Sequence, residues 1–494
     1  MAETPAQARP NVVVAVLALS GITTSLMQTL VIPLVPQLPA LLSTSAADAS
    51  WAVTATLLAA AVATPTIGRL GDMYGKRRML LFSLGMLVTG SVVAGLSSSL
   101  APLVLGRILQ GLSSGVIPLG ISIMRDELPA ERLASATALM SASLGVGGAL
   151  GLPAAAFLAM RTDWHVLFWA SASLGLVALL LVVALVPASS QRTGGRFDLV
   201  GAVGLSVALL CLLLGVSKGA DWGWASGTTL GCFAAAAVVL LVWGRWELRS
   251  PQPLVDLRTS ARRQVLLTNC ASLVFGFAMF AMSMVLPQVL QLPRETGYGL
   301  GYTMLAVGLV MAPNGLLMMA MSPVSAWISR TAGPKVTLMV GAVAVATGYG
   351  LGTALMDSIW QLLIVSCTIG VGIGLAYGAM PTLVMAAVPT SETAAANSLN
   401  TLMRSIGTSS ASAVAGVVLA HMTTSIGSAT FPGQEGFRVI FGIAAGAAAT
   451  ALCIAAFLPA RGSAAAAPAP GASESTATDG VSDATRQDAV GSDP

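Results

Sequence analysis

Charge gathers in one short stretch of this sequence, between two long apolar runs. Residues 68–78 read GRLGDMYGKRR and hold one acid, Asp72, among four bases. A carboxylate next to bases at the ends of apolar segments can form charge-assisted hydrogen bonds that break and re-form when the segments move. Gly68 and Gly75 allow a tight turn and a close approach of neighbouring backbones. Because short loops rich in Lys and Arg stay in the cytoplasm, we expect a cytoplasmic turn here between two membrane helices.

An arginine within an apolar run is the second notable residue. Arg107 lies in LVLGRILQGLSSG, residues 103–115, near the expected outer end of its helix. An arginine at mid-membrane costs roughly 2.5–3.5 kcal/mol on insertion scales. Its side chain must therefore face a polar cavity or a partner such as Gln110 or a backbone carbonyl, unless it reaches out to the headgroups.

Glycines are dense in a third segment, SLGVGGALGLPAAA, residues 143–156. Gly147 and Gly151 form a GxxxG pair, which lets two helices touch backbone to backbone. Pro153 removes one helical hydrogen bond and can bend the helix. Taken alone, the pattern equally fits ordinary packing of small residues.

The composition excludes a soluble protein. The 494 residues are 55% hydrophobic and 9% charged, with a mean hydropathy of +0.83, whereas soluble domains carry about 25% charged residues. The net charge of +4 comes from bases scattered over short loops, so we expect the lipid bilayer and no nucleic acid as a partner. Five cysteines inside apolar runs and two histidines match no disulfide framework, and no metal site is expected.

Apolar runs long enough to span a bilayer recur along the chain. Bases concentrate in alternate loops and tryptophans lie near the ends of the runs, which predicts an all-α polytopic membrane protein with fourteen transmembrane helices. The expected helices are 11–37, 51–68, 79–99, 101–123, 134–160, 165–187, 199–217, 228–246, 264–290, 300–328, 336–355, 359–386, 395–420 and 437–459. Both termini then lie in the cytoplasm.

Polar linkers and composition set the expected domain boundaries. We expect residues 1–190 to form an N-terminal six-helix bundle, 191–263 a central helix pair with its linkers, and 264–460 a C-terminal six-helix bundle. The segment 461–494 has almost no large apolar residue and is expected to be a disordered cytoplasmic tail. The loop SPVSAWISRTAGPK, 322–335, has the place in the second bundle that the charged turn has in the first, as in paired, pseudo-symmetric transporter halves.

These segments together resemble the major facilitator superfamily of transporters, over essentially residues 11–459, and most closely its fourteen-helix drug:proton antiporter branch. The resemblance implies that Asp72 interacts with the other half of the protein and helps to hold an outward-facing state. It implies a role in proton coupling for Arg107. The residues that the resemblance assigns to the gating loop are Gly68, Asp72, Gly75 and Arg77.

The glycine-rich segment resembles the antiporter motif of this family, which marks exporters. The matching residues are Gly147, Gly148, Gly151 and Pro153, although the family usually reads Gly-Pro without the intervening Leu152. The segment LMQTLVIPLVPQLP, 26–39, departs from the family pattern. Met27 stands where that branch has an acid and Ile32 where it has an asparagine, which leaves Gln28 and Thr29 as the polar residues.

None of the twenty carboxylates falls at mid-membrane, and neither histidine does. A proton antiporter commonly needs a titratable group that both sides can reach in turn. Three possibilities stay open. Asp48 could titrate from the outer mouth with Arg107 nearby, Asp126 could titrate from the inner end, or transport could be uncoupled or differently coupled.

Candidate substrate-binding residues are the polar and thioether side chains of the spans. Methionines suit a promiscuous pocket for flat apolar molecules if they face a cavity, although such stripes usually pack in a core. Arg404 favours substrates with negative charge or many acceptors. The expected substrate-binding residues are Met27, Gln28, Asn269, Asn314 and Arg404, with Asn397 and Asn400 as further polar groups.

The function expected from these observations is secondary active export of drugs, antibiotics or related small hydrophobic molecules, in exchange for protons and by alternating access. One alternative is an exporter of an endogenous metabolite that is uncoupled, or that is coupled without a mid-membrane carboxylate. The other is a membrane sensor or scaffold that transports nothing. We expect no enzyme, because Walker A and HExxH motifs are missing. We expect a monomer in the plasma membrane that needs a small-molecule substrate, protons and no cofactor besides the proton gradient.

Overall fold

The computed structural model describes residues 10–31, 34, 37–188, 193–426 and 429–459. The described residues up to Leu458 belong to one compact unit. Among them, 14 helices are long and apolar enough to cross a membrane, which confirms an all-α polytopic architecture. The expected tail 461–494 and Ile32 lie outside the described residues.

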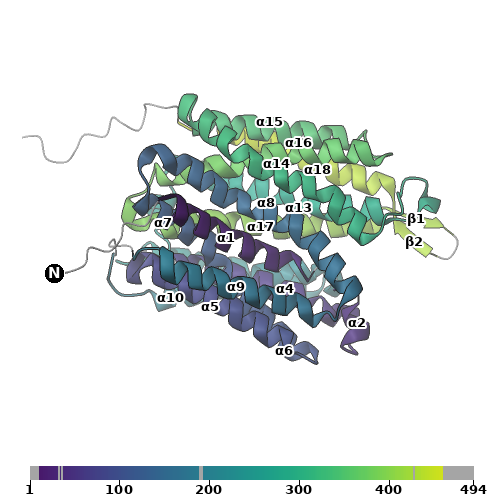
Figure 1. The fold of residues 1–494 in the computed structure, drawn as a ribbon, viewed down its shortest axis with the longest axis horizontal. Coiled ribbons are helices and arrows are strands. Elements are labelled where there is room, and N and C mark those ends of the chain that lie inside the picture. Colours follow the sequence, from purple (N-terminus) through teal and green to yellow (C-terminus); the bar gives the residue numbers. More distant parts are fainter. Residues whose placement is uncertain (1–9, 32–33, 35–36, 189–192, 427–428, 460–494) are drawn as a thin grey trace, which may run out of the picture. The chain divides into compact units, whose positions relative to one another are not determined.

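The spanning helices lie side by side in Figure 1. Those of the first block are α1 (Pro10–Thr29), α4 (Trp51–Tyr74), α5 (Lys76–Gly95), the three-part span α6 (Leu100–Gly111), η2 (Leu112–Gly115) and α7 (Val116–Glu127), α8 (Ala130–Arg161) and α9 (His165–Leu185). The middle pair is α10 (Leu199–Trp222) and α11 (Gly227–Glu247). The last six are α13 (Arg263–Gln291), α14 (Met304–Thr331), α15 (Pro334–Gly352), α16 (Ile359–Met385), α17 (Thr393–His421) and α18 (Gln434–Ala456).

Short elements connect these spans. They are α2 (Leu38–Leu41), α3 (Ala46–Ala49), α12 (Leu257–Ser260), η3 (Arg294–Thr296), η4 (Thr390–Glu392), and the antiparallel strands β1 (Thr423–Ile426) and β2 (Ala429–Pro432). The sequence analysis did not predict the strand pair, because each strand has only four residues and follows directly on a long helix. The pair does not alter the all-α fold.

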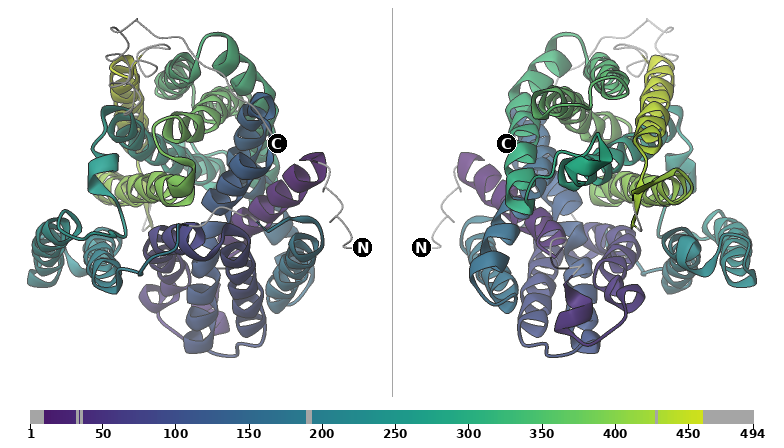
Figure 2. Two further views of the ribbon diagram at one scale, coloured as in Figure 1. Left: turned by 90° about the vertical axis from the view of Figure 1, so that its left-hand side faces the viewer. Right: turned by 90° about the vertical axis from the view of Figure 1, so that its right-hand side faces the viewer.

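The helices gather into two groups in the end-on views of Figure 2, with α10 and α11 at one side. Each group has an apolar core of its own. The groups meet where α4 packs on α17 and where α8 packs on α14. Since the contacts join all the spans into one unit, the domain boundaries at 190 and 263 remain a prediction from the sequence.

The charged stretch 68–78 is mostly helical, which corrects the predicted turn. Helix α4 continues to Tyr74 and α5 begins at Lys76, so the chain reverses at Gly75 alone. The φ of Gly75 is 114°, in a region that side chains disfavour, and this explains why one residue suffices for the turn. The extra helical turn carries Asp72 on the side of α4 that packs on α17.

Two other predicted spans differ from the structure. The helix expected over 11–37 ends at Thr29, because Pro33 has no N–H group to bond with the Thr29 carbonyl. The helix expected over 101–123 tightens into the 3₁₀ turn η2 before Pro118. Pro118 lacks the donor for the α-helical bond to Ser114, so the tighter pattern takes its place.

Candidate functional site

Asp72 links the two helix groups. Its side chain is 1% exposed, in the last turn of α4. The carboxylate accepts hydrogen bonds from the backbone N–H groups of Ala394 at 3.2 Å and Ala395 at 2.8 Å, in the first turn of α17. The first N–H groups of a helix have no partner inside it and carry the positive end of the helix dipole. Asp72 therefore caps a helix of the opposite group, and we call this contact the latch.

Arg125 strengthens the same junction. From the last turn of α7 its guanidinium donates to Thr393 Oγ1 at 2.6 Å, to the Val388 carbonyl at 3.1 Å and to the Pro389 carbonyl at 3.4 Å. All three acceptors belong to the segment that leads into α17. Sequence reasoning missed Arg125, because a base at the end of a span reads as an ordinary topology signal.

The other residues of the expected gating loop have separate tasks. A side chain at Gly68 would collide with Ser398 and would lie 2.9 Å from the Ala394 carbonyl, so this glycine permits the close approach of α4 and α17. Gly75 makes the turn. Arg77 donates to the Val183 carbonyl of α9 at 2.5 Å, which fastens α5 within its own group and does not reach the latch.

Asp126 forms a buried ion pair. Lys76 Nζ lies 2.8 Å from both of its carboxylate oxygens, and the two side chains are 1% and 5% exposed. Asp126 thus serves as a counter-charge for a buried ammonium group. The pair ties α5 to α7, and the expected proton-coupling role of Asp126 remains a prediction that this geometry does not favour.

Arg107 is sealed inside the first group, with 1% of its surface exposed. Its Nε donates to the Ala52 carbonyl at 2.8 Å, and its Nη1 donates to the Met27 carbonyl at 3.2 Å and to Gln110 Oε1 at 2.6 Å. Gln110 in turn donates to Ser91 at 2.9 Å. The predicted partners, Gln110 and a backbone carbonyl, are both present, and four helices converge on the guanidinium.

Asp48 is not joined to Arg107 by any contact between described residues. It is exposed on the short helix α3, where its carboxylate accepts a hydrogen bond from Ser45 at 2.6 Å. The three residues expected to couple protons therefore lie in three separate environments.

The glycines of α8 face different neighbours. A Cβ on Gly147 would lie 2.5 Å from Ser25 Oγ of α1, and one on Gly151 would collide with Thr29 of the same helix. A Cβ on Gly148 would meet no atom within 4 Å. Pro153 lies inside α8, against Gly308 of α14. The GxxxG pair thus packs α8 on α1, whereas Gly148 faces open space.

The polar residues of the second group form two clusters. Asn400 on α17 donates to Asn269 Oδ1 at 3.0 Å and to Ser272 Oγ at 2.6 Å, both on α13. Asn314 on α14 donates to the Ser366 carbonyl at 2.9 Å and contacts the sulfur of Met282. These asparagines are buried and satisfy one another or the backbone, so their expected role in substrate binding remains a prediction.

Arg404 of α17 is partly buried and keeps some exposed surface. Its guanidinium carbon lies 4.8 Å from the centre of the Tyr377 ring, over the ring face. Tyr377 is 1% exposed and its hydroxyl lies 3.4 Å from the sulfur of Met279. In the first group, Gln28 is half-buried, while Met27 is buried and its sulfur accepts from Ser91 Oγ at 3.7 Å.

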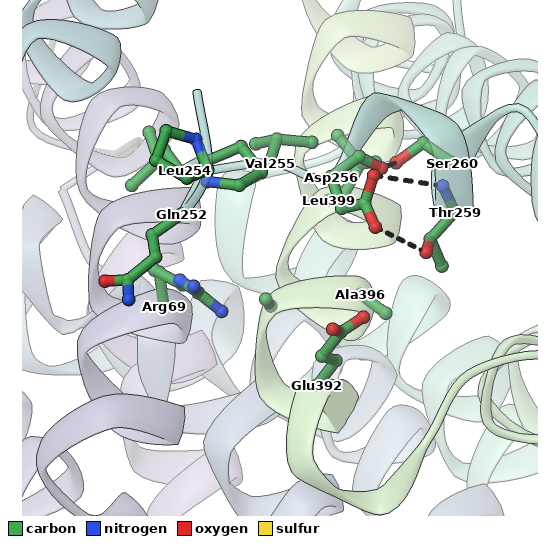
Figure 3. A pocket seen from close by; sticks show the side chains of 13 residues that line it. Arg69, Gln252, Leu254, Val255, Asp256, Thr259, Ser260, Glu392, Ala396 and Leu399 are labelled. Carbon is green, nitrogen blue, oxygen red and sulfur yellow. Dashed lines mark hydrogen bonds between the residues drawn. The ribbon is translucent and has the colours of Figure 1, made fainter. Parts of the chain in front are cut away.

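A pocket of about 200 Å³ lies beside the latch (Figure 3). Arg69 of α4, Glu392 before α17 and the linker around Asp256 line it. Burial raises the pKa of Asp256, but hydrogen bonds from the Thr259 hydroxyl and from the backbone N–H groups of Thr259 and Arg258 outweigh that effect, so the pKa lies below its usual range. The linker after α11 thus borders the junction of the two groups, which sequence reasoning did not predict.

Comparison with curated proteins yields relatives named for resistance and export. The chain is 28% identical over 441 residues to the tetracenomycin C resistance and export protein of Streptomyces glaucescens, covering 85% of this chain and 78% of the relative. It is 27% identical over 378 residues to the multidrug resistance protein Stp of Mycobacterium tuberculosis, covering 75% and 68% of the two chains.

Comparison with solved structures agrees with this fold. The crystal structure of the human organic anion transporter MFSD10 aligns with a TM-score of 0.64 at 15% identity, over 91% of this chain and 100% of that one. At this identity the likeness concerns the fold alone. The family model described as Major Facilitator Superfamily matches residues 17–412, which is most of the chain. This chain therefore belongs to the major facilitator superfamily, a family of multi-pass membrane transporters.

Proposed function

We propose that this protein is a secondary active transporter that exports drugs, antibiotics or related small hydrophobic molecules from the cytoplasm. Its relatives named for antibiotic and multidrug resistance support this cargo class. The observation that carries the proposal is the latch, in which Asp72 of one helix group caps α17 of the other. A transporter that works by alternating access needs a junction of this kind, closed in one state and open in the other.

The strength of the latch suits a reversible gate. Hydrogen bonds to charged groups contribute about 1.5–3 kcal/mol each. Asp72 accepts two of them and Arg125 donates three, and these groups exchange their partners for water when the helix groups separate. We propose that the latch and both chain termini lie on the cytoplasmic side, an orientation that the bases at this end favour. The closed latch then corresponds to access from outside.

Export of an endogenous metabolite is the second candidate. One observation favours it: the described carboxylates lie at or beyond the ends of the spans. None of them is placed to act as a mid-membrane proton carrier or as a counter-ion for a cationic drug. Exchange for protons is the coupling that the family resemblance implies, and export without proton exchange is the alternative that this placement of the carboxylates favours. Action as a monomer in the plasma membrane is a further part.

Dye transport into everted membrane vesicles tests the export function. Vesicles from a host without its own dye exporters would be energised by respiration and offered ethidium, Nile red and fluorescein, which are cationic, neutral and anionic. We expect at least one dye to accumulate severalfold over empty vesicles. The matched control is Glu435→Gln, which removes an exposed acid from the beginning of α18 and should transport normally. Failure of all three dyes to accumulate would contradict the export function.

A further inference from the structure

Arg404 carries a charge that the described part of the chain does not neutralise. It lies near the middle of α17, about 16 Å along the helix from its beginning. Apart from the stacking on Tyr377, no hydrogen bond or ion pair between described residues reaches its guanidinium. A guanidinium has five N–H donors, and a charged side chain at this depth is rare unless it serves a pathway or a ligand.

Arg107 shows what a structurally satisfied arginine looks like in the same protein. It is sealed from solvent and donates to the carbonyls of Ala52 and Met27 and to the Gln110 side chain. Arg404 keeps exposed surface and lacks such acceptors. The comparison indicates that Arg404 is arranged for an acceptor that the protein itself does not supply.

The charges kept at mid-span are positive. In the described part of the chain, every carboxylate lies within a few residues of a helix end or between helices. Arg404 and Arg107 are the bases within the spans that lie away from the helix ends. A positive charge without a counter-charge inside the bundle attracts anions and repels cations, because charges interact strongly where water is scarce.

We propose that the exported species is a flat organic anion that binds Arg404 beside Tyr377, and that the membrane potential drives its export without a proton carrier. This inference rests on the proposed export function and specifies its substrate class and energy source. The planar guanidinium can donate two parallel hydrogen bonds to a carboxylate or phenolate. Tyr377 and the nearby Met279 offer apolar surface for an aromatic ring.

The driving force is sufficient for an anion. The cytoplasm is negative, so an anion leaves it in the direction that the potential favours. At about 100 mV the equilibrium ratio outside to inside reaches roughly 50-fold for each negative charge. A titratable group at mid-membrane is then unnecessary, and this accounts for the placement of the carboxylates at the ends of the spans.

Liposomes with the purified full chain test both statements. Fluorescein, an anion, and rhodamine 123, a cation, share one ring system and serve as matched probes. In the first arm, a potassium gradient with valinomycin makes the lumen positive for fluorescein or negative for rhodamine 123, and a protonophore keeps protons at equilibrium. In the second arm, the potential is held at zero and the lumen is acid. Liposomes without protein correct for passive entry.

We expect fluorescein to accumulate at least tenfold in the first arm, without accumulation in the second and without accumulation of rhodamine 123. Uptake driven by the pH gradient would overturn the potential-driven mechanism. Uptake of rhodamine 123 without fluorescein would overturn the anion while leaving the export function intact. If neither probe enters in either arm but a dye of the vesicle panel is exported, the anion proposal fails and the export function stands.

Variants at Arg404 assign the selectivity to this residue. Arg404→Gln should lower fluorescein uptake at least tenfold, and Arg404→Lys, which retains the charge, should recover part of it. Arg438→Gln removes a half-exposed arginine at the outer end of α18 and should transport as the wild type does. Thermal unfolding of each variant in detergent shows whether it is folded. Wild-type uptake of fluorescein by folded Arg404→Gln would overturn the assignment.

Discussion

At the scale of single residues, Asp72 combines burial with a task that only an anion performs well. Its two acceptor bonds lie at the beginning of α17, where the helix dipole favours negative charge. Asp72→Asn keeps the size of the side chain and loses the charge. Loss of a helix cap and its charge weakens such a contact by about 1–2 kcal/mol. The ratio of closed to open latch should then fall about 5- to 30-fold.

The first prediction is that Asp72→Asn loses most dye transport while its level in the membrane stays normal. Vesicle uptake measures transport, and immunoblotting of membranes measures insertion. Glu435→Gln, which neutralises an exposed acid, is the control and should behave as the wild type does. Normal transport by Asp72→Asn would show that the contact is structural and has no gating role.

Arg107 leads to a prediction about stability. Arg107→Ala would remove the donor to the Met27 carbonyl and the Gln110 side chain in a buried place, whereas the Ala52 carbonyl would keep its bond from the Thr56 hydroxyl. Buried acceptors without a partner cost about 1–3 kcal/mol, so we expect a loss of about 2–3 kcal/mol. Thermal unfolding in detergent should show a lower Tm. Arg438→Ala, on the surface, should change the Tm little, and an unchanged Tm for Arg107→Ala would contradict the assigned bonds.

The sequence predicts individual residues best where their type conflicts with their surroundings. Arg107 was identified because a base inside an apolar run needs partners, and the partners are the predicted kinds. Arg125 and Tyr377 escaped notice because a base at a helix end and an aromatic ring in a span are ordinary. The contact of the Met27 sulfur with Ser91 was not predicted, because the rotation of α1 about its axis cannot be determined from a helix this uniformly apolar, and the role of Met27 in substrate binding stays a prediction.

At the scale of helices, the glycines of α8 divide into contact and open positions. Gly147→Ala would place a methyl group 2.5 Å from Ser25 Oγ and 2.7 Å from the Leu26 backbone nitrogen. Because the backbone cannot easily move away, such overpacking costs about 1–3 kcal/mol. Gly148→Ala meets no atom within 4 Å and gains about 0.8–1 kcal/mol of helix propensity.

We therefore predict a lower Tm for Gly147→Ala and an equal or higher Tm for Gly148→Ala. The two variants introduce the same methyl group at neighbouring positions of one helix, so each is the control for the other. Equal destabilisation by both would contradict the packing of α8 on α1.

The positions of the helices were more predictable than their ends. Fourteen spans follow from apolar length, because lipid demands continuous apolar surface and satisfied backbone groups. The ends depend on single residues. The charged stretch 68–78 was read as a turn because charge usually stops a span, but only Gly75 reverses the chain and Asp72 remains helical. Asp72 stays within its helix and is buried because its charge caps another helix. The sequence around Asp72 does not show which helix that is.

At the scale of the whole molecule, the pairing of distant helices is what the sequence left undetermined. Asp72 meets Ala395 across more than 300 residues, and the apolar faces of α4 and α17 would suit many neighbours. Small residues mark the seams after the fact: Gly68 lets α4 approach α17, and Gly315 lets α14 approach α8. Similar glycines elsewhere pack helices of one group, so glycine alone does not identify the seam between groups.

The last prediction concerns the motion of one group against the other. A Cβ on Gly71 would lie 3.9 Å from the Cβ of Ala394, within the range of about 3.5–4.5 Å that a disulfide requires. A cysteine at position 71 also displaces a methyl group of Leu119, a flexible side chain that can rotate away. The double variant Gly71→Cys, Ala394→Cys, in a background without the five native cysteines, should form a disulfide between α4 and α17 on oxidation.

If transport requires the latch to open, oxidation should abolish dye transport by the double variant, and a reductant should restore it. Mass spectrometry of the joined peptides measures the extent of the bond, and each single variant should transport equally under both conditions. Full transport by the cross-linked protein would mean that α4 and α17 stay together through the cycle. The cytoplasmic gate would then have to lie elsewhere, and the seam where α8 packs on α14 and α16 also joins the two groups.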